Sequence, residues 1–163
     1  MKRFLAPLLT ALVVLCATQP AFTETNLRIA TYNIKFLHED INAQRRDKLI
    51  SVIDHLDAQI IALQEIKDRA ALETIFDKDK WYLIIDDDSG EQQDLAIAIR
   101  KPWTPVGIDP DGDAENRQFL FPQSGDNYHF PDRRDILAVP VLAPNGEDQI
   151  HVLVVHAKSR YGG

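Results

Sequence analysis

The segment Ile60-Ile-Ala-Leu-Gln-Glu-Ile66 joins a short apolar run to two polar residues at its end. An apolar run of this length indicates a buried β-strand over Ile60–Leu63. A helix is predicted just before it, over Arg45 to Leu56, with Asn42 as its N-cap. The apolar stripe of that helix consists of Leu49, Ile50, Ile53 and Leu56.

The rest of the chain alternates strand and helix patterns around this segment. A second helix is predicted over Asp68 to Phe76, with the aspartate at its positively polarised end. The Pro144-Asn-Gly-Glu147 turn predicts a hairpin between the last two strands. A short strand is also expected near Val106. The fold class is therefore α/β (α+β), with further strands at Leu27–Tyr32, Trp81–Ile85, Leu95–Ile99, Ile136–Leu142 and Ile150–Val155.

Two of these strands, Leu95–Ile99 and Val152–Val155, are apolar on both faces. Strands of this kind need cover on both sides of the sheet. The two predicted helices can cover one side only. We therefore expect that the layer covering the other side is not contained in this sequence.

The N-terminus has the pattern of a secretory signal peptide. Lys2 and Arg3 precede an apolar run from Phe4 to Cys16, and small and polar residues follow. The run is shorter than the roughly 20 residues of a membrane span. We expect a signal peptide over residues 1–21, cleavage before Leu27, export to the periplasm or medium, and no stable membrane insertion. N-terminal sequencing of the exported protein tests this.

The alternative for the same segment is a lipoprotein anchor on Cys16. The bulky Leu15 before it disfavours that interpretation. Cys16 is the only cysteine, so the mature domain would rely on core packing or bound metal rather than on disulfides. The formal net charge of −7 excludes a general polyanion binder, so any nucleic-acid contact must use a local basic surface.

Three polar residues, Asn33, Glu65 and His156, follow predicted strands. Ligand sites in open α/β sheets gather at strand ends. Carboxylate and amide oxygens suit Mg²⁺, and a histidine beside them could donate a proton or bind phosphate. Taken singly, each is as readily an ordinary polar residue at the point where a strand leaves the core.

The motifs Thr31-Tyr-Asn-Ile-Lys-Phe36, Ile61-Ala-Leu-Gln-Glu-Ile66 and Val154-Val-His-Ala-Lys-Ser159 resemble the first motifs of the endonuclease/exonuclease/phosphatase superfamily, in particular its deoxyribonuclease I-like members. The resemblance covers nearly all of residues 27–163. It implies the N-terminal half of a four-layered α/β/β/α sandwich, and an enzyme that hydrolyses phosphodiesters.

The resemblance also implies roles for matching residues. Glu65 would be the principal metal ligand, and Asn33 would bind the metal or the scissile phosphate. His156 would protonate the leaving oxygen or hold the phosphate, and Asp86 would orient that histidine. For Asp86, which precedes Asp87 and Asp88, a solvated acidic turn is the alternative. The implied cofactor is Mg²⁺, with Mn²⁺ or Ca²⁺ as alternatives.

Four basic residues are candidate contacts for substrate phosphates, which favours DNA or RNA as the substrate. Contacts of this kind hold a nucleic acid without reading its sequence. A pair of ordinary surface arginines is an equal alternative for Arg133 and Arg134. The four candidates are Lys35, Lys67, Arg134 and Lys158.

The later motifs of the superfamily, Gly-Asp-x-Asn and Ser-Asp-His, do not occur in this sequence. We therefore expect the C-terminal half of the domain to be absent, and residues 27–163 alone to be neither active nor a compact monomer. One alternative function is a phospholipase or sphingomyelinase, for which Phe119-Leu-Phe121 offers a faint membrane contact. The other is a non-catalytic, truncated remnant.

Overall fold

The computed structural model describes residues 26–85, 94–107 and 136–156. The signal-peptide segment, Asp86, Arg134, Lys158 and Phe119–Phe121 lie outside these residues, so the predictions made for them stay predictions. Most predicted elements agree with the structure to within a few residues. The elements are β1 (Ile29–Leu37), α1 (Ala43–Leu56), β2 (Ile60–Ile66), α2 (Arg69–Glu73), β3 (Trp81–Ile85), β4 (Asp94–Arg100), β5 (Thr104–Pro105), β6 (Ile136–Leu142) and β7 (Gln149–Val155).

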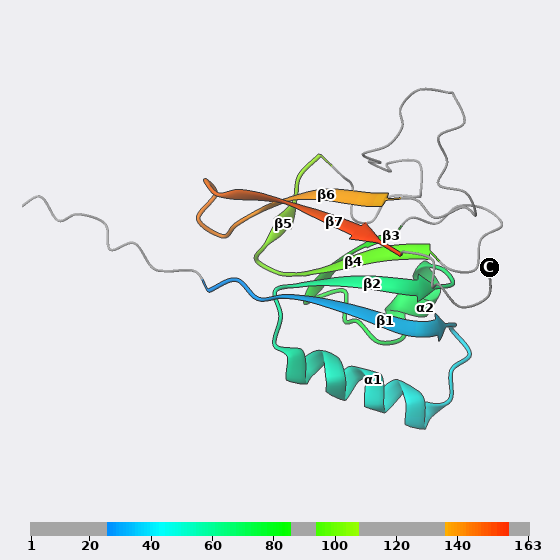
Figure 1. Cartoon of the computed structure of the whole chain (residues 1–163). Coiled ribbons are helices and arrows are strands. Elements are labelled where there is room, and N and C mark those ends of the chain that lie inside the picture. The colour runs from blue at the N-terminus through cyan, green and yellow to red at the C-terminus, as the bar shows by residue number, and fades with distance from the viewer. Residues whose placement is uncertain (1–25, 86–93, 108–135, 157–163) are drawn as a thin grey trace, which may run out of the picture.

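The elements form three layers (Figure 1). The central layer is a four-stranded sheet in the order β1-β2-β4-β3, in which β1 and β2 are neighbours that pair in parallel, whereas β4 pairs antiparallel with both β2 and β3. Helix α1 connects this parallel pair. The third layer is an antiparallel sheet in the order β5-β6-β7. Strands β1 and β7 are thus edge strands of their respective sheets.

Helix α1 begins and ends where its local chemistry requires. The side chain of Asn42 accepts a hydrogen bond from the backbone N–H of Arg45 at 2.9 Å, which confirms the predicted N-cap. At the other end, Asp57 takes a left-handed conformation and its N–H bonds the carbonyl of Asp54. Leu49 and Ile53 are buried, and they anchor the helix on the central sheet.

The two faces of the central sheet bury separate cores. Ile61 and Leu63 of β2 point toward the helices, with Ala96 and Ala98 of β4 on the same side. The opposite face of these two strands packs against the second sheet. That second core contains Ile60, Ala62, Ile84, Leu95, Ile97, Ile99, Trp103, Leu137, Val139, Val141, Ala143, Val152 and Val154.

The expectation that the sequence lacks the layer covering β4 is wrong. The sheet formed by β5, β6 and β7 covers it, and Ile97 and Ile99 are completely buried. The physical reason is that strands 136–142 and 149–155 do not extend the first sheet but stack on it. The outer face of β7 does remain open, because Leu153 and Val155 are 50% and 48% exposed.

Candidate active site

Asn33, Glu65 and His156 come together at one end of the two sheets, although they belong to three different strand segments. The amide Nδ2 of Asn33 donates to Oε1 of Glu65 at 2.9 Å. Nε2 of His156 lies 3.5 Å from the same carboxylate oxygen. His156 follows β7 of the second sheet, so the cluster bridges the two β-layers.

The prediction that Asn33 and Glu65 follow their strands is wrong: both residues lie inside their strands. β1 continues to Leu37 and β2 to Ile66, and the pairing of both strands is interrupted near the two residues. The interruptions are β-bulges, which re-aim side chains next to functional sites.

The bulge in β2 is centred on Glu65, whose φ is 64°. Before it, Ile61 and Leu63 face the helices; after it, Ile66 faces the helices as well. Regular alternation would have put residue 65, not 66, on that face. The left-handed residue shifts the alternation by one position, so that the Glu65 carboxylate can reach His156 of the other sheet.

The corresponding irregularity in β1 consists of Lys35 and Phe36, with φ values of 58° and 56°. Non-glycine residues rarely adopt this conformation, and bulky ones almost never do. Ile34 and Leu37 both end up in the helix-side core, as Ile66 does in the neighbouring strand. In these two adjacent strands, the alternation of side chains between the two faces of the sheet therefore shifts at the same level of the sheet.

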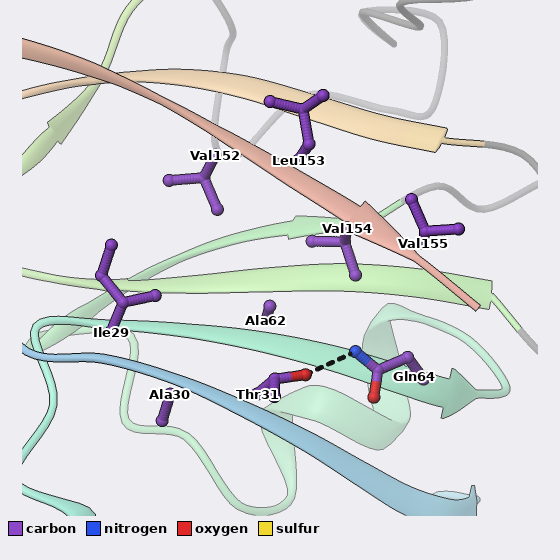
Figure 2. Close-up of a pocket in the computed structure, with 9 residues that line it drawn as sticks. All are labelled: Ile29, Ala30, Thr31, Ala62, Gln64, Val152, Leu153, Val154 and Val155. Carbon is purple, nitrogen blue, oxygen red and sulfur yellow. Dashed lines mark hydrogen bonds between the residues drawn. The ribbon is translucent and has the colours of Figure 1, made fainter. Parts of the chain in front are cut away.

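Gln64, the residue before Glu65, has a structural role. It is 8% exposed, and its amide Nε2 donates to Oγ1 of Thr31 at 3.0 Å (Figure 2). This bond joins β1 to β2 next to the site. Both residues line a groove of about 390 Å³ between the edge strands β1 and β7, and Figure 2 labels both among its lining residues.

The two lysines predicted near the site differ in their surroundings. Nζ of Lys67 bonds both carboxylate oxygens of Glu39 at 2.8 Å, and lies 3.5 Å from Asp68. The hydrogen bond with Glu39 raises the pKa of Lys67, and in return it lowers the pKa of Glu39. Lys35 is exposed, and its ammonium group makes no ion pair with the described residues.

The donor set fits a hard divalent cation bound mainly through Glu65. Mg²⁺ is commonly held by one or two carboxylates together with waters and substrate phosphates. Oε2 of Glu65 makes no hydrogen bond within the described part of the chain, and the side chain is 15% exposed. Among those same residues, no group of three His, Cys, Asp or Glu side chains surrounds a cation position.

Sequence reasoning did not single out Asp94, another acidic residue at this end of the sheet. It is 2% exposed, begins β4 and pairs in register with Ile66, the residue after Glu65. The available signal was an acid at the start of a long apolar run.

No helix in the described ranges is long and apolar enough to cross a membrane.

The profile of the Endonuclease/Exonuclease/phosphatase family matches residues 30–155, a range that includes Asn33 and Glu65 and ends one residue before His156. The chain belongs to this family. The family expectation drawn from the motifs is thereby confirmed. No curated protein sequence matches the chain.

Solved structures of this fold align with most of the chain. Truncated TDP2 of Caenorhabditis elegans superposes with a TM-score of 0.55 at 18% identity, covering 82% of this chain and 47% of its own. TDP2 of D. rerio, complexed with single-strand DNA product, gives 0.51 at 17%, covering 83% and 48%. The human Nocturnin catalytic domain with bound sulfate gives 0.51 at 15%, covering 83% and 52%.

The chain thus spans about half the length of these structures. At these identities the likeness concerns the fold alone. The three described layers agree with the predicted N-terminal half of a four-layered sandwich.

Proposed function

We propose that this chain carries the metal-binding and histidine-bearing part of a divalent-metal-dependent phosphodiester hydrolase that acts on nucleic acid. The observation that supports it most is the convergence of Asn33 and His156 on Oε1 of Glu65. Such a cluster is not needed to hold the sheets together, because both cores are apolar. Membership of the family supports the same class of reaction.

Glu65 would hold the cation, with Asn33 beside it. A divalent cation supplies charge neutralisation on phosphoryl oxygens and acidifies bound water. Oδ1 of Asn33 already accepts the N–H of Lys35 at 2.9 Å, so the amide presents its N–H₂ group toward Glu65. This orientation favours phosphate binding and carboxylate orientation by Asn33 over direct metal ligation.

His156 would donate a hydrogen bond or a proton to the phosphate or the leaving oxygen. Its Nε2 lies 3.5 Å from Oε1 of Glu65. Lys35 would contact the backbone of a nucleic acid near the strand ends. The D. rerio TDP2 structure with single-strand DNA product is consistent with a nucleic-acid substrate.

The first test is Glu65→Gln in the natural gene product, with any sequence beyond residue 163 retained. The change removes one negative charge at nearly constant volume. We expect the rate of plasmid nicking with Mg²⁺ or Mn²⁺ to fall by about 100-fold or more, as for loss of one electrostatic contributor to a transition state. EDTA should abolish the wild-type activity.

The matched control is Glu73→Gln, which removes the same charge from α2, where Glu73 pairs with Lys78 at 3.3 Å. It should leave nicking unchanged. Full activity of Glu65→Gln at saturating metal would exclude Glu65 from the reaction. Hydrolysis of sphingomyelin vesicles but not of DNA or RNA would favour the lipid phosphodiesterase, and no hydrolysis of either would favour the non-catalytic remnant.

A further inference from the structure

The left-handed turn at Lys35 and Phe36 needs something to hold it. A non-glycine residue is strained in this region of backbone conformation, and here two such residues are adjacent. The ladder with β2 is interrupted between Asn33 and Leu37, so regular sheet pairing does not hold the turn.

Arg45 of α1 stabilises this turn by hydrogen bonds. Its Nη2 donates to the carbonyl of Ile34 at 2.9 Å and to the carbonyl of Lys35 at 2.6 Å. Hydrogen bonds from an ionised donor are about twice as strong as neutral ones. The backbone of Arg45 is itself fixed, because its N–H bonds the side chain of the N-cap Asn42.

The Ile34 carbonyl and the Lys35 N–H belong to the same peptide group. That N–H donates to Oδ1 of Asn33 at 2.9 Å, and Nδ2 of Asn33 then faces Glu65. Because a peptide group is planar, fixing its carbonyl also fixes the direction of its N–H. A continuous path of hydrogen bonds thus leads from Arg45 to the Glu65 carboxylate.

We propose that Arg45 is a positioning residue of the candidate site: it orients the 34–35 peptide, and through it the amide of Asn33. The catalytic consequence rests on the proposed function, whereas the orientation itself does not. Arg46, the next residue of the same helix, is a matched control, because in the described structure its guanidinium pairs only with Asp47, at 3.3 Å.

The experiment compares Arg45→Met, Arg45→Lys and Arg46→Met in the natural gene product. We expect Arg45→Met to lower kcat for DNA nicking by about 10- to 100-fold with little change in KM, since small displacements of a site carry losses of this size. Arg45→Lys, which keeps the charge but whose side chain is one bond too short to place its nitrogen at the position of Nη2, should lie between. Arg46→Met should match the wild type.

A double-mutant cycle with Asn33→Ala separates positioning from general stabilisation. If Arg45 acts through Asn33, Arg45→Met should cost almost no further activity once Asn33 is alanine. An equal loss in both backgrounds would overturn the proposal. Should Arg45→Met fail to fold, the same cycle with Arg45→Lys decides.

A second measurement does not depend on catalysis. NMR of the Mg²⁺-loaded protein should show the Asn33 side-chain amide and the Lys35 N–H shifted in Arg45→Lys but unchanged in Arg46→Met. Unchanged signals in Arg45→Lys would overturn the positioning role. If the signals shift in Arg45→Lys but the wild-type protein shows no EDTA-sensitive hydrolysis, the positioning role is supported and the proposed function is contradicted.

Discussion

At Glu65 a single backbone angle decides what the end of β2 presents to solvent. The φ of 64° moves Ile66 into the helix-side core and releases the carboxylate toward the second sheet. Glycine would adopt this angle without strain, but it would remove the acid. The strain at Glu65 is therefore tied to the identity of its side chain.

The ion pair with Glu39 neutralises the positive charge of Lys67, which follows Glu65 by two residues. The lowered pKa of Glu39 means that the contribution of the pair to stability is present above the ordinary carboxyl pKa and is lost as the pH falls through the lowered value. The raised pKa of Lys67 means that this contribution is lost only as the pH rises through that raised value. The pair is therefore intact throughout the neutral range, so substitution tests it better than pH does.

We expect Glu39→Gln to release Lys67 for contact with phosphate and to strengthen oligonucleotide binding at low salt. The plot of log K against log salt concentration should steepen by about 0.7–0.9 for one additional phosphate contact. Fluorescence anisotropy at several salt concentrations measures this slope. Glu147→Gln, on the β6–β7 turn, is the charge-matched control. An unchanged slope would mean that Lys67 does not face the substrate.

At the scale of elements, α1 depends on its N-cap. Asn42→Ala leaves the N–H of Arg45 without its side-chain acceptor. We expect a loss of about 1 kcal/mol in the free energy of unfolding, measured by urea denaturation of the natural gene product. Ser at the same position should retain most of the stability. A loss as large with Ser as with Ala would mean that Asn42 contributes by something other than capping.

Most elements could be predicted because their local signals are strong. The Trp81–Ile85 and Ile136–Leu142 strands agree residue for residue with the structure, and the cap at Asn42 is where the sequence puts it. The bulges could not be predicted, because Lys35, Phe36 and Glu65 are not residues that favour a left-handed backbone. Tertiary contacts, such as those of Arg45, stabilise that conformation.

The partition of the strands between two sheets could not be predicted either. An apolar run such as Leu95–Ile99 indicates that both of its faces are covered, but it does not say by which segment. For the candidate site, polar residues that follow apolar runs could be identified, and the structure brings three of them together, although two of these lie inside their strands. The phosphate contacts at Arg134 and Lys158 stay predictions, since they lie outside the described residues.

At the scale of the whole molecule, three residues with exposed large aliphatic side chains belong to the two edge strands that border the same groove. Ile29 of β1 is 54% exposed, and Leu153 and Val155 of β7 are 50% and 48% exposed. Figure 2 shows Ile29 between the two edge strands, and Leu153 and Val155 on the side of β7 that faces away from β1. Unpaired strand edges next to exposed apolar groups promote association.

We therefore expect residues 27–163, expressed alone, to associate in a concentration-dependent manner. Leu153→Lys should shift the equilibrium toward monomer in sedimentation velocity. Val52→Lys, which puts the same charge on a 40% exposed position of α1, should not. A monomeric chain at all concentrations, or an equal effect of both substitutions, would contradict association through this groove.

The parallel β1–α1–β2 unit has a consequence for the order in which the site forms during synthesis. Asn33 and Glu65 are 32 residues apart and belong to one compact supersecondary unit. Chains emerge from the ribosome N-terminal end first, and contacts close in sequence form fastest. The amide–carboxylate pair can therefore be in place while the hairpin that delivers His156 is still untranslated. The approach of His156 to Glu65 is then the last event in the assembly of the cluster, because it requires that the second sheet has stacked on the first.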